Sequence, residues 1–465
     1  MVYAPRPLRS PSPLPGLSSQ EMRCFDFFRF RTAIELAGPF TAGIWNTIIL
    51  QAAHSESAIV HAILALGALH ESFVEHQDPH AATSEYAMHH YTQAIERVIK
   101  LDLSRCSDHF DVVLMTSIIF AAFESLRGHL KPALTHIASG ANILAEIDPK
   151  TGSVRRGFLP REVFLPTFTR LENQITEIDG KTIGGPSIKS IPKRPLPPLP
   201  HKFASISDAQ IAFDCLINWL WRLLAPIHTE DNPSFEAQME TERETQHITA
   251  YFSHWCTVFD QSGFSQTDPA VLILRANMQQ LQICQVCAFG HDEMIWDGFT
   301  PQFESLLDCI GQLMAIPSFP ASDDGNGTAQ PFSPLGEHRV QSQGTMKPTF
   351  TFIIGIITPL YFTITRCRDP IIRRRGVHML FNCNRKEGVW DSALAASIAK
   401  RIISIEESGA IGSPITHASQ IPAIARVGES EIYTGHGREG KIGYRLGLVA
   451  ADAPVEETKL ESFAW

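Results

Sequence analysis

The sequence predicts an all-α fold, in which stacked antiparallel helical hairpins form one elongated body with Pro- and Gly-rich interruptions. Two observations support this prediction. Apolar residues recur at the α-helical period along most of the chain, and short polar turns join these stretches. In addition, 465 residues with 44% hydrophobic side chains suffice to bury a large core.

The interruptions divide the chain into seven segments of different composition. In order, we expect a disordered Pro/Ser-rich tail at 1–20, an N-terminal helical part at 21–148, a Pro-rich linker at 149–204, a middle helical part at 205–317, a flexible loop at 318–346, a C-terminal helical part at 347–409 and a Gly-rich tail at 410–465. The weak pattern of the last segment fits short strands or an ordered tail. The P-x-x-P spacing near residue 200 fits a stiff connector better than an SH3-domain ligand.

The N-terminal helical part shows the clearest periodicity. Ile59, Ile63, Leu66 and Phe73 recur near the 3.6-residue period, with Ala and Gly between them that allow close packing. Residues 111–126 are apolar nearly all round, which predicts a central buried helix that Gly128 ends.

Charge and cysteine content restrict the function classes. The formal net charge of −10 argues against a general nucleic-acid binder, because neutralising phosphates needs a basic surface. Nine cysteines spread over the chain fit a reducing compartment better than a disulfide framework. The first 20 residues lack the apolar run of a signal peptide, and Pro359 breaks the longest apolar stretch. We therefore expect a soluble intracellular protein.

One short stretch, "CRDPIIRRRGVHML" at 367–380, concentrates arginines in this acidic chain. Asp369 and Pro370 fit the N-cap and first position of a helix. One apolar stripe then follows: Ile372, Gly376, Met379, Leu380 and Cys383. The consecutive Arg373, Arg374 and Arg375 should fan across the exposed arc at about 100° each.

A helix that reads a DNA groove repeats basic or amide side chains along one face, and these three arginines do not repeat. We therefore expect a solvated or acid-paired face rather than a nucleic-acid contact, with a weak nuclear-import signal as an alternative use of the tripeptide. After them Gly388 breaks the chain, Trp390 should pack into a core, and Asp391 or Ser392 should cap the next helix. The buried side of that helix is predicted from Leu394, Ile398, Ile402 and Ile405.

This part of the sequence resembles the regulatory region of the fungal zinc-cluster transcription factors. The resemblance lies in the combination of a Pro-Leu-Tyr-Phe entry, a Cys-Arg-Asp-Pro helix and an Arg-x-Glu-Gly-x-Trp-Asp turn within 359–407. The opening helices of the same region resemble "WNTIILQAAHSESAIVHAILALGALHES" and "FESLRGHLKPALTHIASGANILAE". Together the resemblance covers about residues 25–408. It implies an all-α, non-catalytic region that mediates control and dimer contacts rather than DNA reading.

The cysteines of this sequence do not have the spacing of that family's zinc cluster. Six thiolates are needed in two Cys-x2-Cys pairs, whereas this chain has the single pair Cys284 and Cys287, with Cys309 far downstream and Cys24 near the start. Buried structural cysteines explain the pair better than zinc. Three explanations for the missing cluster stay open: a truncated gene model, a genuine loss, or a partner that supplies DNA binding.

A Gly-rich stretch, "GHGREGK" at 435–441, satisfies a G-x-G-x-x-G pattern and most of a P-loop. Ile442 stands where a P-loop needs Ser or Thr, and Gly443 and Gly447 disfavour the helix that would bind phosphate. A Gly-rich tail is therefore the better interpretation.

The 19 histidines also lack a site pattern. His61 and His70 are nine positions apart and His89 and His90 are adjacent, so neither pair has the i, i+4 spacing of a helical metal site. Gly128 and Pro132 interrupt the pattern between His129 and His136. Hydrogen-bonded structural histidines are expected, and no catalytic, cofactor-binding or metal-binding residue is predicted.

The resemblance implies a transcription regulator in the nucleus, with control of a secondary-metabolite gene cluster as the family-based expectation. It would act through protein contacts, as a homodimer or with a full-length zinc-cluster factor, and would reach DNA only indirectly or through a missing zinc cluster. No cofactor, enzyme activity or membrane contact is expected, and a small effector is compatible with the helical interior. The alternatives are a helical protein–protein scaffold without a transcriptional role and, third, an enzyme or small-molecule carrier.

Overall fold

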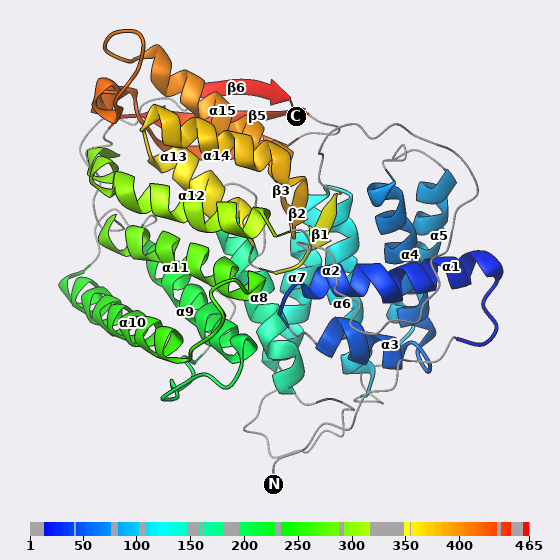
Figure 1. The fold of residues 1–465 in the computed structure, drawn as a ribbon. Coiled ribbons are helices and arrows are strands. Elements are labelled where there is room, and N and C mark those ends of the chain that lie inside the picture. Colours follow the sequence, from blue (N-terminus) through cyan, green and yellow to red (C-terminus); the bar gives the residue numbers. More distant parts are fainter. Residues whose placement is uncertain are drawn as a thin grey trace.

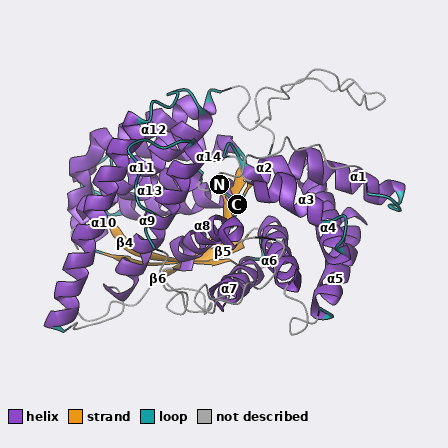
Figure 2. Cartoon of the chain, turned by 90° about the horizontal axis from the view of Figure 1, so that it is seen from below, coloured by secondary structure: helices purple, strands orange, loops and turns teal. Residues whose placement is uncertain are grey.

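The structure of the protein is a computed structural model. It describes residues 14–40, 43–75, 82–101, 108–146, 159, 161–179, 195–227, 234–287, 293–316, 348–353, 355–434, 439–447 and 459–464. The described chain is predominantly helical, which confirms the predicted all-α class, and strands form only two small groups (Figures 1 and 2).

The first body of the fold contains the N-terminal helices, shown in blue and cyan in Figure 1. Its elements are α1 (Ser19–Phe27), the π-helix η1 (Phe28–Thr32), α2 (Ala33–Ala37), the π-helix η2 (Ile44–Ile48), α3 (Ile49–Ala52), α4 (Ser57–Val74), α5 (Ala82–Ile99), α6 (Asp108–Leu126) and α7 (Leu130–Glu146). The packed pairs α4–α5 and α6–α7 are the hairpins that the sequence predicts. Of the expected stripe, Ile59, Ile63 and Leu66 are buried in this first core, and Phe73 is partly buried against it.

Helix α6 is apolar on all sides because other helices surround it. By length and composition α4 and α6 would both suffice to cross a membrane, but 61% and 83% of their apolar windows are buried within the fold. This is the pattern of core helices in a globular body. Gly128, with a φ of 79°, follows α6 and turns the chain into α7.

The second body contains the middle and C-terminal helices, from green to orange in Figure 1. Its elements are α8 (Arg161–Asp179), α9 (Ile206–Ile227), α10 (Phe235–Gln261), α11 (Pro269–Cys287), the 3-10 helix η5 (Glu293–Phe299), α12 (Thr300–Met314), α13 (Ile357–Arg366), α14 (Pro370–Cys383) and α15 (Ser392–Ser408). Most of them share a second core, in which Trp255 and Phe213 are fully buried. Helix α8 instead packs between α7 and α9 and links the two bodies.

A small sheet joins the two cores at the centre of Figure 1. Strand β1 (Thr349–Thr351) pairs in parallel with β2 (Arg385–Glu387), which pairs antiparallel with β3 (Trp390–Asp391). Phe350 belongs to the first core and Ile353 to the second, so this short segment is shared by both. The segment 347–409, which the sequence predicts to be helical, therefore begins with strand β1 instead of a helix.

A second sheet, at the top of Figure 1, contains β4 (Val427–Thr434), β5 (Glu439–Leu446) and β6 (Lys459–Ala464). All three strands are antiparallel, in the order β4-β5-β6. The sheet packs on α15, where Ile398, Ile402 and Ile405 form a third apolar cluster with Val427 and Ile442. Of the two possibilities for the Gly-rich tail, the structure shows short strands.

The structure differs from the predicted linker at 149–204, because residues 161–179 form helix α8. The burial of Phe164, Phe168 and Leu171 at helical spacing stabilises it, and Pro166 is accommodated in its second turn. Helix α1 likewise starts at Ser19, inside the predicted tail, through a capping box of Ser18 and Glu21.

The Pro-rich end of the predicted linker packs on the second core. Leu196 and Leu199 contact the core, and the Tyr251 hydroxyl donates to the Pro197 carbonyl at 2.8 Å. This arrangement fits a connector laid across a helical surface. The flexible loop predicted at 318–346 lies outside the described residues.

Candidate regulatory surfaces

The arginine-rich segment lies at the start of α14, where Asp369 caps the helix and Pro370 takes its first position, as predicted. The apolar stripe that begins at Ile372 is also buried as predicted. Arg373, however, is fully buried, so its predicted exposure is wrong. Its guanidinium donates to Glu406 Oε2 at 2.6 Å and to the Ile364 carbonyl at 3.0 Å.

Glu406 of α15 is the acid at the centre of this segment. Arg368 donates to its second oxygen, Oε1, at 2.9 Å, and the backbone N–H of Val427 donates to Oε1 at 2.8 Å. Burial alone would raise the pKa of Glu406, but Arg368 and Arg373 outweigh it and lower that pKa below its ordinary value. The carboxylate therefore holds the α13–α14 turn, α15 and the start of β4 together.

A second acid, Glu293 of η5, extends the same network. It accepts from Arg368 at 2.8 Å and from Arg366 at 2.7 Å. Next to it the fully buried guanidinium of Arg426 makes two bonds, 2.8 and 2.7 Å, with the carboxylate of Asp297. Such a bidentate pair fixes orientation as well as charge.

The remaining arginines of the triplet are also paired with acids, at the surface. Arg374 lies 2.9 Å from Glu407 and is 55% exposed, and Arg375 lies 2.7 Å from Asp308 and is 41% exposed. The prediction of an acid-paired face is therefore confirmed for Arg374 and Arg375, whereas Arg373 pairs with its acid in the interior. Since each guanidinium is bonded to a carboxylate of the fold, this segment does not present a row of free cations to phosphate.

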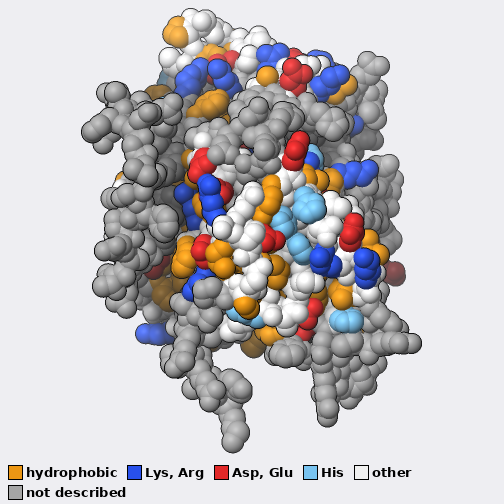
Figure 3. All heavy atoms as spheres, turned by 90° about the vertical axis from the view of Figure 1, so that its right-hand side faces the viewer, with side chains coloured by type: hydrophobic (Ala, Val, Ile, Leu, Met, Phe, Trp, Pro, Cys, Tyr) orange, Lys and Arg blue, Asp and Glu red, His pale blue; other side chains and the backbone are white. Residues whose placement is uncertain are grey.

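Histidines gather on the opposite end of the molecule. Figure 3, which views the right-hand side of Figure 1, shows several histidine side chains close together over the helices of the first body. His61 of α4 and His90 of α5 share a hydrogen bond between their Nδ1 atoms at 2.7 Å, and their rings stack at 5.0 Å. Burial lowers the pKa of His61 to about 4 and also lowers the pKa of His90.

Other histidines that the sequence analysis weighed make separate structural bonds. His70 is fully buried, with Nδ1 2.9 Å from the Thr32 hydroxyl and Nε2 3.3 Å from Glu35. His129 contacts Glu124 at 2.9 Å, and His136 lies 3.0 Å from the Tyr91 hydroxyl. Within the described part of the chain, no three His, Cys, Asp or Glu side chains are placed to hold a metal ion.

The two motifs weighed as ligand sites have other roles in the fold. Cys284 is half-buried on α11, and the side chain of Cys287 lies outside the described residues. Lys441, the last residue of the P-loop-like stretch, lies in the antiparallel strand β5, paired with Tyr433 of β4. A P-loop needs a strand followed by a helix N-terminus, so this hairpin excludes it; residues 435–438 lie outside the described chain.

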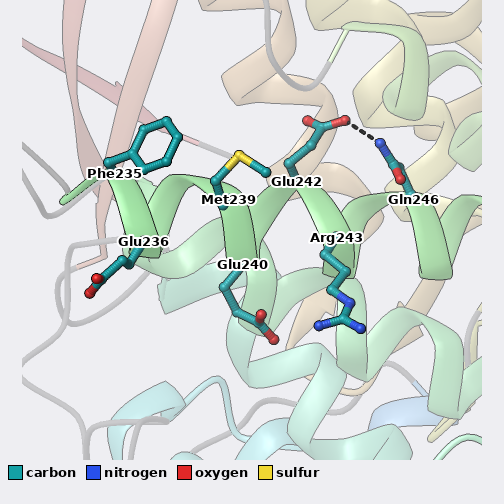
Figure 4. A pocket seen from close by; sticks show the side chains of 7 residues that line it. All are labelled: Phe235, Glu236, Met239, Glu240, Glu242, Arg243 and Gln246. Carbon is teal, nitrogen blue, oxygen red and sulfur yellow. Dashed lines mark hydrogen bonds between the residues drawn. The ribbon is translucent and has the colours of Figure 1, made fainter.

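The first half of α10 presents a third distinctive surface (Figure 4). Phe235 and Met239 are 75% and 56% exposed, although both are large and apolar. They line a shallow pocket together with Glu236, Glu240, Glu242, Arg243 and Gln246. No motif in the sequence predicts this surface.

Comparison with known proteins shows which family the first body resembles. Residues 38–165, which extend from the end of α2 into α8, match the fungal specific transcription factor domain. The chain is similar to this family over that segment. The matched residues form most of the first body, and the predicted resemblance is confirmed.

A curated relative extends the similarity beyond the fungal transcription factor domain. The aspercryptin biosynthesis cluster-specific transcription regulator of Emericella nidulans is 26% identical over 501 aligned positions, which cover 92% of this chain and 80% of the relative. The second body is thus part of the similarity. No solved structure matches the chain. The chain is thus similar to fungal transcription regulators, over 38–165 in the domain match and over most of its length in the curated relative.

Proposed function

We propose that this protein controls transcription of a secondary-metabolite gene cluster in the nucleus, and that it does so through protein contacts without enzyme activity. The observation that carries the proposal is the similarity, across 92% of the chain, to a regulator that is specific for one biosynthetic cluster. The paired arginines of α14 support protein contact over DNA contact, because each of their charges is already paired with a carboxylate of this chain.

The proposed partners are a second copy of this chain or a full-length zinc-cluster factor. A full-length factor would bring the regulatory domain to a promoter while the α14 arginines stay bonded to Glu406, Glu407 and Asp308. The net charge of −10 favours this indirect route, since an acidic protein is repelled by DNA unless a basic element overcomes the repulsion.

Deletion of the gene followed by transcript profiling tests the proposal. The expected result is a coordinated change in neighbouring biosynthetic genes, restored when the gene is returned. A fluorescent fusion of the full chain should enter the nucleus. Unchanged transcripts in every biosynthetic cluster, or strictly cytosolic fluorescence, would support the scaffold alternative instead.

A further inference from the structure

The orientation of the first half of α10 is the reverse of what burial would favour. In a surface helix the large apolar residues normally face the body and the polar residues face water. Here the half-buried positions are the small residues Ala237, Thr241 and Thr245, together with Glu244. Phe235 and Met239 project the other way, and no residue of α10 before Ile248 is buried.

Two apolar stripes therefore exist on one helix. Ile248, Phe252 and Trp255 hold the second half of α10 in the second core. At about 100° per residue, Phe235 and Met239 lie on nearly the opposite side from that stripe. They cannot reach the core that holds the rest of the helix, and Figure 4 shows both side chains directed away from the helix on the same side.

The charge around this stripe indicates what kind of surface it fits. Residues 235–247 contain four glutamates, at 236, 240, 242 and 244, and one arginine, at 243, which gives a net charge of −3 (1 − 4). Two copies of this helix placed together would combine −6, so self-association at this surface is disfavoured. DNA and anionic membranes are disfavoured for the same reason, whereas a basic protein surface is complementary.

We infer that residues 235–246 of α10 form a docking helix for a protein partner whose apolar groove is bordered by Lys and Arg. Phe235 and Met239, one turn apart, are the anchors that enter the groove. Glu242 lies on the side of the anchors, where it accepts a hydrogen bond from Gln246, and Glu236 and Glu240 extend from the flank of the helix toward the basic border. This inference rests on the proposed function, in which the regulator acts through protein contacts, and it names the surface and the partner's chemistry.

Photocrosslinking of the full chain, in the cells that naturally produce this protein, tests the inference. The photocrosslinker p-benzoylphenylalanine is placed at position 239, and the adduct is identified by mass spectrometry. The expected adduct joins position 239 to an apolar groove rimmed by Lys or Arg in a different protein. An adduct with a second copy, with a segment of the same chain or with an acidic or polar surface would overturn the inference, as would no adduct.

The affinity of the purified full chain for the captured protein then tests whether Phe235 and Met239 are the anchors. The double variant F235S/M239S should weaken binding at least tenfold, because truncating central anchors removes most of the affinity of such a groove. The control I99S removes an apolar residue of α5 that is 76% exposed, and it should change the affinity by less than twofold. Equal effects of both variants would refute the role of α10.

Transcript levels separate this inference from the proposed function. If deletion of the gene changes no cluster, the proposed function fails. If deletion changes a cluster but F235S/M239S, with an unchanged melting temperature, maintains wild-type transcripts, only the docking helix fails. Loss of cluster control by F235S/M239S but not by I99S is the outcome that supports both.

Discussion

Arg373 and Glu406 are both fully buried, and their charged atoms lie 2.6 Å apart between α14 and α15. The same carboxylate also binds the buried guanidinium of Arg368 and the first backbone N–H of β4. One side chain of α15 thus balances two buried cations and positions the C-terminal sheet. Two of the arginines in this segment, Arg368 and Arg373, are therefore explained by the internal packing of the fold.

Replacement of Glu406 by Gln should destabilise the protein strongly. The amide keeps the shape but leaves Arg373 as a buried cation without a counter-charge and Arg368 with Glu293 alone, which costs about 3–5 kcal/mol. Urea unfolding of the full chain, followed by circular dichroism, measures the change. The neighbouring Glu407→Gln is the matched control, because its partner Arg374 is 55% exposed and such pairs contribute about 0–1 kcal/mol. Equal losses in both variants would contradict the buried role of Glu406.

The sequence predicts α14 well because the relevant signals are local. The N-cap Asp369, the Pro370 start and the stripe from Ile372 to Cys383 all depend on neighbours within a few turns. The burial of Arg373 depends instead on Glu406, 33 positions away, and on α15 covering a second side of the helix. No helical projection of α14 alone contains that information.

The two missed features had weaker local signals. Phe164, Phe168 and Leu171 recur at helical spacing inside a segment whose overall Pro and Gly content predicts a linker. In α10 the signal was the mismatch between the stripe of Phe235 and Met239 and the stripe that starts at Ile248. Composition averaged over long segments hides both patterns.

The stability of the first body should decrease in mild acid because of the His61–His90 pair. Burial lowers the pKa of His61 from 6.5 to about 4, with Arg97 and His90 acting in the same direction and Glu21 opposing them. The folded state therefore needs the neutral ring, and its contribution is complete above pH 6.5 and is lost as the pH falls toward 4. The hydrogen bond between the Nδ1 atoms also needs one neutral ring.

The variant H61N isolates this effect. Between pH 7 and pH 4.5 the wild type should lose on the order of 1–2 kcal/mol more unfolding free energy than H61N. The control H54N changes an exposed histidine between α3 and α4, and its pH profile should follow that of the wild type. A wild-type profile parallel to that of H61N would refute the prediction.

Two glycines in helices should respond to alanine in opposite directions. At Gly67 of α4 an added Cβ would lie 2.3 Å from the backbone oxygen of Cys24 in α1, which cannot move as a flexible side chain can. We expect G67A to cost about 1–3 kcal/mol. At Gly311 of α12 the nearest atom is 3.6 Å away, so G311A should stabilise the protein by about 0.5–1 kcal/mol through its higher helix propensity. Thermal unfolding distinguishes the two, and stabilisation by G67A would show that α1 does not pack this closely on α4.

The buried thiols should resist alkylation while the protein is folded. Burial raises the pKa of Cys24, Cys309 and Cys383 to about 11 and that of Cys367 to about 12, so at pH 8 about a thousandth or less of each is the reactive thiolate. Iodoacetamide treatment of the native chain should leave these four unmodified, as peptide mapping can show, and the same treatment in guanidinium should modify them all. Only an exposed thiol has its ordinary pKa. Rapid labelling of any of the four in the native protein would therefore mean that the surrounding structure opens far more readily than the burial of the thiol implies.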